Sequence, residues 1–362
     1  MNHLPSPLQE IAQSRWTSQR AWDWWNPRPW SVGCNYIPST AVNQLEMWQP
    51  DTFDTQTIDR ELAWLSALGM NTMRVFLHDL LLQPDPAPFL DRIEQYLKIS
   101  ARHGISTLFV FFDSCWHPFP YAGRQREPEP GVHNSGWLQS PGFRILRDPA
   151  AFARLEPYVS GVVEHFRDDP RIEGWDVWNE PDNPNENTYG HRDIREGKGD
   201  LVLPLMAEAF RWIRAARPSQ PVTSGVWRWT RDFTEELTPL HQFQVDASDV
   251  ISFHTYLPPE ATKRAVDTLK RYGRPLLCTE YMARPIGSTF QAILPLFKQE
   301  GIAAYNWGSV SGKSQTIYPW NSWQNPCPPE PPIWFHDIFR PDGSPYRREE
   351  TDLIRSLTIP AR

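Results

Sequence analysis

The sequence predicts an α/β protein with one domain, a (β/α)8 TIM barrel with long loops at the carboxyl ends of its strands. Eight short apolar runs, rich in β-branched and aromatic residues, alternate along the chain with segments of helical periodicity. No shift in composition marks a second domain within the 362 residues. Hydrophobic residues make up 40% of the chain, which is enough to form a large core. A barrel of roughly 250 residues with insertions fits this length.

The first part of the chain shows how each element is assigned. Residues 1–30 are expected to form a lead-in that packs on the barrel, and residues 31–362 form the barrel itself. The helix expected at 57–68 carries apolar side chains at helical spacing and ends at Gly69. In the strand that follows, residues 70–77, apolar side chains alternate with Thr72, Arg74 and Phe76.

The same reasoning assigns the remaining elements, and glycines end several of the helices. The expected strands are 31–36, 70–77, 105–113, 171–180, 221–227, 249–256, 275–280 and 302–307. The expected helices are 57–68, 88–103, 150–166, 201–216, 234–243, 259–272, 288–299 and 349–357. Side chains at the carboxyl ends of such strands converge on one pocket.

Composition excludes several classes of protein. A net charge of −7 without a basic run argues against a nucleic-acid partner, and no apolar run is long enough to cross a membrane. The first 20 residues show no apolar leader, which predicts a cytoplasmic protein.

Four cysteines without CxxC spacing are expected to be reduced, buried thiols, and we expect neither a metal nor another cofactor. The 18 tryptophans suggest flat surfaces on which sugar rings stack.

The segment 171–181 is the most informative stretch, because a buried strand there ends in Asn179-Glu180-Pro181. Burial among tryptophans raises the pKa of a carboxyl group, as a general acid working near neutral pH requires. The alternative is a glutamate that caps the strand in a surface turn. Strict alternation sends Asn179 and Glu180 to opposite faces, so the strand must end or bulge here if both enter the pocket.

The other strand ends are polar or aromatic, whereas a purely structural barrel end would be aliphatic. The candidates are Asn35, Arg74, Asp113, Asn179, Glu180, Trp227, His254, Tyr256, Glu280 and Trp307. Glycoside hydrolysis uses two carboxyl groups that face each other across a pocket. One is protonated and assists the leaving oxygen, and the other is ionised and attacks the anomeric carbon or activates water. Arg74 would keep a nucleophilic carboxylate charged, and His254 and Tyr256 share one strand face from which both reach the pair.

Several short motifs resemble, in order and location, the clan A glycoside hydrolases, and among them family 5, the cellulase-, mannanase- and xylanase-like enzymes. They are Asn71-Thr72-Met73-Arg74-Val75, Trp178-Asn179-Glu180-Pro181, His254-Thr255-Tyr256, Thr279-Glu280-Tyr281 and Tyr305-Asn306-Trp307-Gly308. The resemblance covers most of residues 30–357 and implies a retaining β-glycosidase with a carbohydrate substrate.

The resemblance also implies a role for each matched residue. Glu180 would be the acid/base, Glu280 the nucleophile and Asn179 the partner of the sugar 2-hydroxyl. Arg74 and Tyr256 would orient Glu280, His254 would support the site, and Trp307 would form the floor of the sugar subsite.

One part of the sequence departs from the family pattern. Family 5 members commonly carry a histidine just after the third strand, where this chain has Asp113-Ser114-Cys115-Trp116-His117. His117 is the candidate substitute.

Trp116, Trp227 and Trp229 are among the loop tryptophans of which some should face the sugar. The proline-rich loops 114–148 and 308–332 either wall off one end of a cleft or line an open groove.

Two other functions use the same barrel. A metal-dependent hydrolase would use His78, His254, Glu280 and Asp176 as ligands, but the chain lacks the His-x-His pair typical of early strands in such enzymes. A sugar-binding protein without catalysis is the other, and the presence of both Glu180 and Glu280 argues against it.

Overall fold

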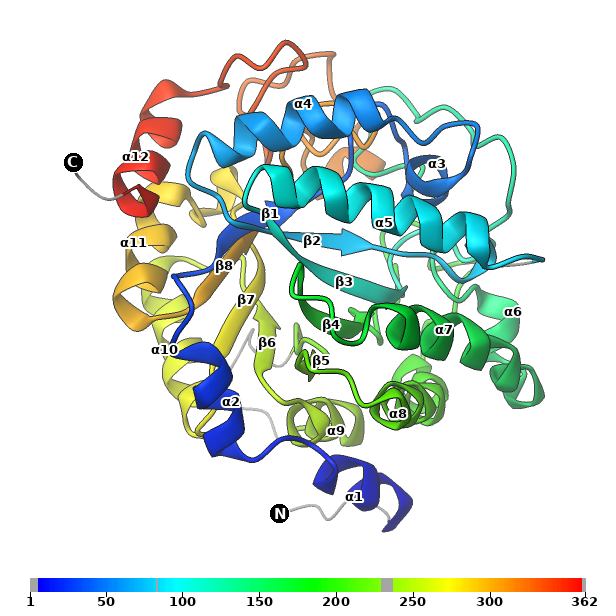
Figure 1. Cartoon of the computed structure of the whole chain (residues 1–362). Coiled ribbons are helices and arrows are strands. Elements are labelled where there is room, and N and C mark those ends of the chain that lie inside the picture. Colours follow the sequence, from blue (N-terminus) through cyan, green and yellow to red (C-terminus); the bar gives the residue numbers. More distant parts are fainter. Residues whose placement is uncertain (1–5, 83, 229–236, 360–362) are drawn as a thin grey trace.

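A computed structural model describes residues 6–82, 84–228 and 237–359. Eight parallel strands form a barrel in the order β5-β4-β3-β2-β1-β8-β7-β6, and Figure 1 shows helices arranged around it. The strands are β1 (Val32–Asn35), β2 (Thr72–Phe76), β3 (Ser106–Asp113), β4 (Ile172–Asn179), β5 (Val222–Thr223), β6 (Ile251–His254), β7 (Leu276–Tyr281) and β8 (Ala303–Asn306). The predicted (β/α)8 barrel is confirmed, because each expected strand overlaps one of these, and β7 extends one residue beyond the expected 275–280.

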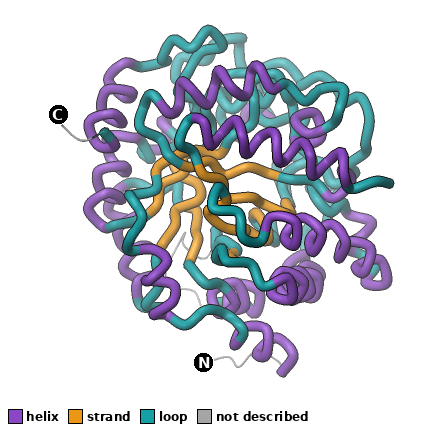
Figure 2. The backbone as a smooth tube through the Cα atoms, viewed as in Figure 1, coloured by secondary structure: helices purple, strands orange, loops and turns teal. Residues whose placement is uncertain are grey.

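Helices follow the strands and cover the outside of the barrel, as Figure 2 shows in purple around the orange strands. The α-helices are α1 (Ser6–Gln13), α2 (Ser18–Trp25), α3 (Gln44–Trp48), α4 (Thr55–Ser66), α5 (Ala87–Arg102), α6 (Phe143–Leu146), α7 (Glu156–Phe166), α8 (Lys198–Ala216), α9 (Pro239–Ala247), α10 (Pro259–Lys270), α11 (Phe290–Glu300) and α12 (Arg348–Thr358). Short 3-10 helices are η1 (Asp79–Leu81), η2 (Pro149–Leu155), η4 (Arg284–Ile286) and η5 (Trp320–Trp323).

The fifth strand is much shorter than the expected 221–227. The ladder to β4 ends at Thr223, and the next N–H, that of Ser224, donates to the Ser248 hydroxyl (3.1 Å). The chain returns to the sheet at Val226, whose N–H donates to the Ser252 carbonyl (3.1 Å) and whose carbonyl accepts from the His254 N–H (3.0 Å). This bridge, together with the bond from the Asp249 N–H to the Val222 carbonyl (2.8 Å), closes the barrel between β5 and β6.

The helix expected at 234–243 lies later in the chain. Residues 234–236 are outside the described residues, and α9 begins at Pro239 after Thr238, whose hydroxyl accepts from the His241 N–H at 3.2 Å. A threonine cap followed by proline is a strong helix start, which fixes the boundary here.

The lead-in covers the amino-terminal end of the barrel. The Trp16 N–H donates to an Asp249 carboxylate oxygen (2.7 Å), and the Ser18 hydroxyl donates to the Gly273 carbonyl after α10. Trp16 and Ala21 pack against side chains of the strands, namely Leu108, Val250, Leu277, Ala303 and Tyr305. In Figure 1, α1 and α2 accordingly lie beside α9 and α10.

The sequence also led to expectations about membrane-spanning segments and about the cysteines. None of the described helices combines the length and the apolarity that a membrane crossing needs. All four cysteines are free thiols, and Cys34, Cys115 and Cys278 are buried, as expected, whereas Cys327 is only partly buried, contrary to the expectation.

Candidate active site

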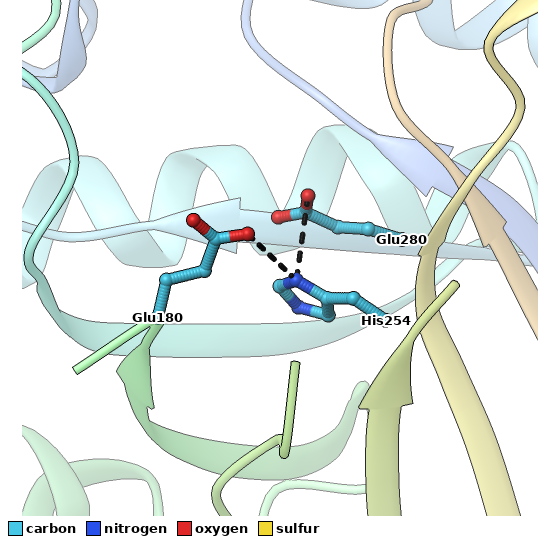
Figure 3. Close-up of side chains that lie close together, drawn as sticks. All are labelled: Glu180, His254 and Glu280. Atoms are coloured by element: carbon cyan, nitrogen blue, oxygen red, sulfur yellow. Dashed lines mark hydrogen bonds and ion pairs between the residues drawn. The ribbon is translucent and has the colours of Figure 1, made fainter. Parts of the chain in front are cut away.

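A cavity of about 760 Å³ opens at the carboxyl ends of the strands, and Glu180 and Glu280 both line it. Figure 3 shows the two carboxylates and the His254 ring converging from three different strand ends. The predicted site residues that line the cavity are Trp116, Asn179, Glu180, Trp227, His254, Tyr256, Glu280 and Trp307. The sequence-based expectation of one convergent pocket therefore describes the geometry well.

Glu180 enters the cavity because β4 ends immediately before it. Its backbone has a φ of 45°, in the left-handed region that a non-glycine residue seldom occupies, so the chain turns and Asn179 and Glu180 both face the cavity. The Cys115 thiol (3.2 Å) and the Asn183 amide (2.6 Å) both donate to Glu180 Oε2. Burial nevertheless dominates and raises the pKa of Glu180 to about 7.

Glu280, within β7, lies in a different electrostatic setting. Arg74 Nη1 donates to its Oε1 (3.1 Å), and the Tyr256 hydroxyl donates to its Oε2 (2.8 Å). Burial raises the pKa of Glu280 to about 7 and the nearby charge of Glu180 adds to this, whereas Arg74 and Tyr256 favour the ionised form.

The two carboxylates are close enough for the charge of one to raise the pKa of the other. Oxygens of Glu180 and Glu280 lie within 4.8 Å of each other, and His254 Nδ1 lies 3.1 Å from Glu180 Oε1 and 3.5 Å from Glu280 Oε2. Burial lowers the pKa of His254 to about 4, so the ring is neutral. Arg74 contacts Glu280 at 3.1 Å. This contact favours the charged form of Glu280, whereas Glu180 accepts its hydrogen bonds from a thiol and an amide.

Arg74 is held from behind by a fully buried network. Its guanidinium donates twice to Asp176 Oδ2 (3.0 and 2.8 Å), once to Asn35 (2.9 Å) and once to Asn179 Oδ1 (2.9 Å). The Asn179 amide in turn donates to Asp113 Oδ1 (3.0 Å). Asn35, Arg74 and Asp113 therefore stand behind the cavity wall and orient the groups that form it.

Tryptophans form much of the apolar wall. Trp307 is 9% exposed and packs edge-on against Phe76 and Trp137, while Trp116 stacks on Trp323 at 6.0 Å between ring centroids. The Trp227 indole donates to Asp182 Oδ1 (2.7 Å), which fixes its ring at the cavity edge. Trp229 lies outside the described residues.

His117 does not reach the glutamates, which corrects the expectation that it substitutes for the family histidine. The chain turns at Trp116, whose φ is 67°, and the His117 ring packs at 4.8 Å from Tyr189 beside a separate cavity of about 490 Å³. The thiol of Cys115 occupies the place beside Glu180 instead. Cys115 follows the end of β3 and was identifiable as a strand-end residue, but Asn183 lies in an irregular loop and carried no such signal.

The four ligands proposed for a metal-dependent hydrolase are not gathered in one place, since His254 and Glu280 lie together but, among the described residues, neither His78 nor Asp176 has a ligand atom in their group. Among the described residues, the three side chains whose ligand atoms come close enough to hold a metal ion are Glu180, His254 and Glu280. These are the two carboxylates and the neutral histidine ring described above.

No protein-family model matches the chain, and no curated protein sequence is similar to it. Solved structures are similar at low sequence identity. An exo-β-1,4-mannosidase from Opitutaceae bacterium strain TAV5 has a TM-score of 0.59 and 18% identity over 91% of this chain, which spans 60% of the length of that protein. A β-1,4-mannanase from Aplysia kurodai has a TM-score of 0.55 and 16% identity, with 77% of this chain and 88% of that one covered.

A third similar structure is a GH5_18 protein from Streptomyces cattleya in complex with Manβ1-4GlcNAc. Its TM-score is 0.58 and its identity 14%, with 91% of this chain and 80% of that one covered. The resemblance to family 5 that the motifs indicated is thus confirmed as a likeness of fold.

Proposed function

We propose that the protein is a retaining β-glycoside hydrolase of the family 5 type, with Glu180 as acid/base and Glu280 as nucleophile. The observation that carries this proposal is the buried carboxylate pair, whose oxygens lie within 4.8 Å of each other while a cation and a tyrosine hydroxyl contact only Glu280. Inverting enzymes hold their carboxylates about 6.5–9.5 Å apart to admit a water molecule, and the shorter separation here favours direct attack.

The reaction takes place in two displacements. A Glu280 carboxylate oxygen attacks the anomeric carbon while the bond to the leaving oxygen breaks, and the Glu180 proton passes to that oxygen. Water then attacks the anomeric carbon of the glycosyl ester, gives its proton to Glu180 and releases Glu280. Burial raises the pKa of Glu180 to about 7, so that it can hold a proton near neutral pH, and the hydrogen bonds from Arg74 and Tyr256 favour the ionised form of Glu280, as this sequence of steps requires.

The surrounding residues take the remaining roles. His254, neutral and in contact with both carboxylates, fills the space between them without adding charge. Asn179, aligned by Arg74 and Asp113, presents its amide to the sugar 2-hydroxyl. Trp307 supplies the apolar floor on which the reacting sugar rests.

For the substrate, we infer short β-linked mannosides. The similar structures carry the names mannosidase and mannanase, and one holds Manβ1-4GlcNAc. Side chains of the loops 114–148 and 308–332 line the cavity, among them Asn134 and Trp320, and a volume of about 760 Å³ suits an oligosaccharide of few residues. The walled arrangement of these two loops is therefore favoured over the open groove.

A panel of substrates tests this proposal. Aryl β-mannoside, β-glucoside and β-xyloside, Manβ1-4GlcNAc and β-mannan are incubated with the protein, and the products are sized by chromatography. We expect the mannoside and the disaccharide to be hydrolysed fastest, with full activity after treatment with EDTA. Binding of sugar without release of product would identify a sugar-binding protein, and loss of activity with EDTA would favour a metal-dependent hydrolase.

A further inference from the structure

The position of the Glu180 carboxyl group depends on two loops. Its Oε2 accepts one hydrogen bond from the Cys115 thiol, in the loop after β3, and another from the Asn183 amide, in the loop after β4. Three residues of these loops have left-handed backbones, with φ of 45° at Glu180, 67° at Trp116 and 49° at Asn185. Each such conformation is unfavourable for a non-glycine residue and persists only where neighbouring contacts hold it.

One buried ammonium group joins the two loops. Lys198 Nζ donates to the Ser114 carbonyl (3.2 Å), immediately before Cys115, and to the Asn183 carbonyl (2.8 Å). Its third partner is Asp193 Oδ2, at 2.8 Å. The Lys198 and Asp193 side chains are 1% and 0% exposed. All three donors of the ammonium are therefore used, two of them on the backbone segments that contact Glu180.

Asp193 extends the same connection. Its Oδ2 also accepts from the Asn185 amide (2.6 Å) and the Gln139 amide (2.8 Å). The Asn185 amide donates to the Ser114 carbonyl (2.9 Å), and its Oδ1 accepts from the Trp116 N–H (2.9 Å). Two of the three residues with left-handed backbones are thus held directly by this cluster.

A lysine at this position is costly for the fold. Burial of an ammonium carries a desolvation penalty of several kcal/mol even when it is paired. Lys198 also lies in the first turn of α8, where the helix dipole disfavours a cation. An apolar side chain would fill the volume at lower cost, so the ammonium is best explained by the two carbonyls that it holds.

We propose that Lys198, charge-balanced by Asp193, is a positioning residue that holds Glu180 in place to protonate the leaving group. This inference rests on the proposed function, since it assigns a role within that reaction. Lys198 contacts neither the glutamates nor the cavity, and it acts through the loops that carry Cys115 and Asn183.

The dependence of rate on the leaving group tests the proposal. Lys198→Met is compared with the wild type on phenyl and 2,4-dinitrophenyl β-mannosides, the first of which needs protonation and the second does not. Displacement of a catalytic group by about 1 Å costs up to roughly 10²-fold. We expect kcat/KM for the phenyl substrate to fall about 10- to 100-fold and that for the dinitrophenyl substrate to fall less than about threefold.

Matched variants separate positioning from stability. Arg214→Met removes a cation from the opposite end of α8, where it pairs with buried Asp249, and should lower the melting temperature without altering the leaving-group dependence. Asp193→Asn perturbs the same cluster with nearly unchanged volume and provides a second test should Lys198→Met not fold. Glu180→Gln supplies the reference pattern for loss of the acid.

The outcomes distinguish this inference from the proposed function. If the wild type hydrolyses no aryl glycoside of the panel, both fail. If it hydrolyses another aryl glycoside but neither mannoside, only the substrate assignment fails, and the comparison is made with the phenyl and 2,4-dinitrophenyl forms of that glycoside. If the wild type and Glu180→Gln show the expected difference between substrates, but Lys198→Met and Asp193→Asn slow both substrates equally, the proposed function survives and the positioning role of Lys198 is overturned.

Discussion

Replacement of Tyr256 with phenylalanine removes one oxygen from the site and leaves the rest of the side chain in place. The Tyr256 hydroxyl donates to Glu280 Oε2 at 2.8 Å, while its ring contacts Trp320 and His336, contacts that phenylalanine retains. A hydrogen bond to a charged group contributes about 1.5–3 kcal/mol. Because this bond favours the ionised carboxylate, its loss raises the pKa of Glu280 further above its ordinary value.

The sign and the size of the effect follow from the protonation of Glu280. The carboxylate attacks only when it is ionised, so the acid limb of the pH profile of kcat/KM should move to higher pH. Below that limb, kcat/KM should fall by roughly 10- to 150-fold, since about 1.4 kcal/mol corresponds to a factor of ten. At higher pH the loss should shrink as Glu280 ionises.

A 2,4-dinitrophenyl mannoside is the suitable substrate, because its leaving group needs no proton and the alkaline limb due to Glu180 disappears. Tyr158→Phe is the matched control, since that buried hydroxyl donates to the Phe111 carbonyl (3.0 Å) away from the cavity. An acid limb that stays in place in Tyr256→Phe, or a loss that is equal at every pH, would refute the assignment of Tyr256 as the group that keeps Glu280 ionised.

Three further predictions concern the proposed mechanism. Glu280→Gln should lower turnover by several orders of magnitude, and Glu180→Gln should lower it by about 10²–10⁴-fold on a substrate with a poor leaving group. The circular dichroism spectra of both variants should match that of the wild type. Near-normal turnover of Glu280→Gln would contradict the assignment of Glu280 as the nucleophile. Trp307→Ala should raise KM and lower kcat/KM, because the sugar loses its apolar floor, and steady-state kinetics that match the wild type would make Trp307 structural. The first product seen by proton NMR should be the β-anomer, since two inversions restore the configuration; an α-anomer would exclude double displacement.

The arrangement of the barrel was predictable from local signals. Buried strands and glycine-terminated helices carry their pattern in consecutive residues, so Gly69 and Gly301 mark helix ends without any tertiary information. The exception is β5, expected at 221–227 but paired with β4 only at Val222–Thr223. Beyond Thr223 the chain leaves the ladder to β4, and the Ser224 N–H donates to the Ser248 side chain, a contact that local sequence does not reveal.

The convergence of Glu180 and Glu280 was predictable as well, because parallel strands in a barrel bring their carboxyl ends to one face. The sequence also required the strand to end or bulge at Asn179-Glu180 if both residues were to face the cavity. Only the structure shows how this happens, through a left-handed backbone at Glu180 that loop contacts sustain.

Contacts within the loops were decided by tertiary structure alone. His117 looked like a substitute for the family histidine, yet the turn at Trp116 directs its ring toward Tyr189. Lys198 reaches Ser114 across 84 positions of sequence. Irregular loops have no periodicity that predicts which way a side chain points. In addition, each backbone donor or acceptor in such a loop can pair with any of several segments of the chain. The sequence by itself therefore determined the barrel and the pair of glutamates, whereas long-range packing selected the side chains that hold Glu180 in position.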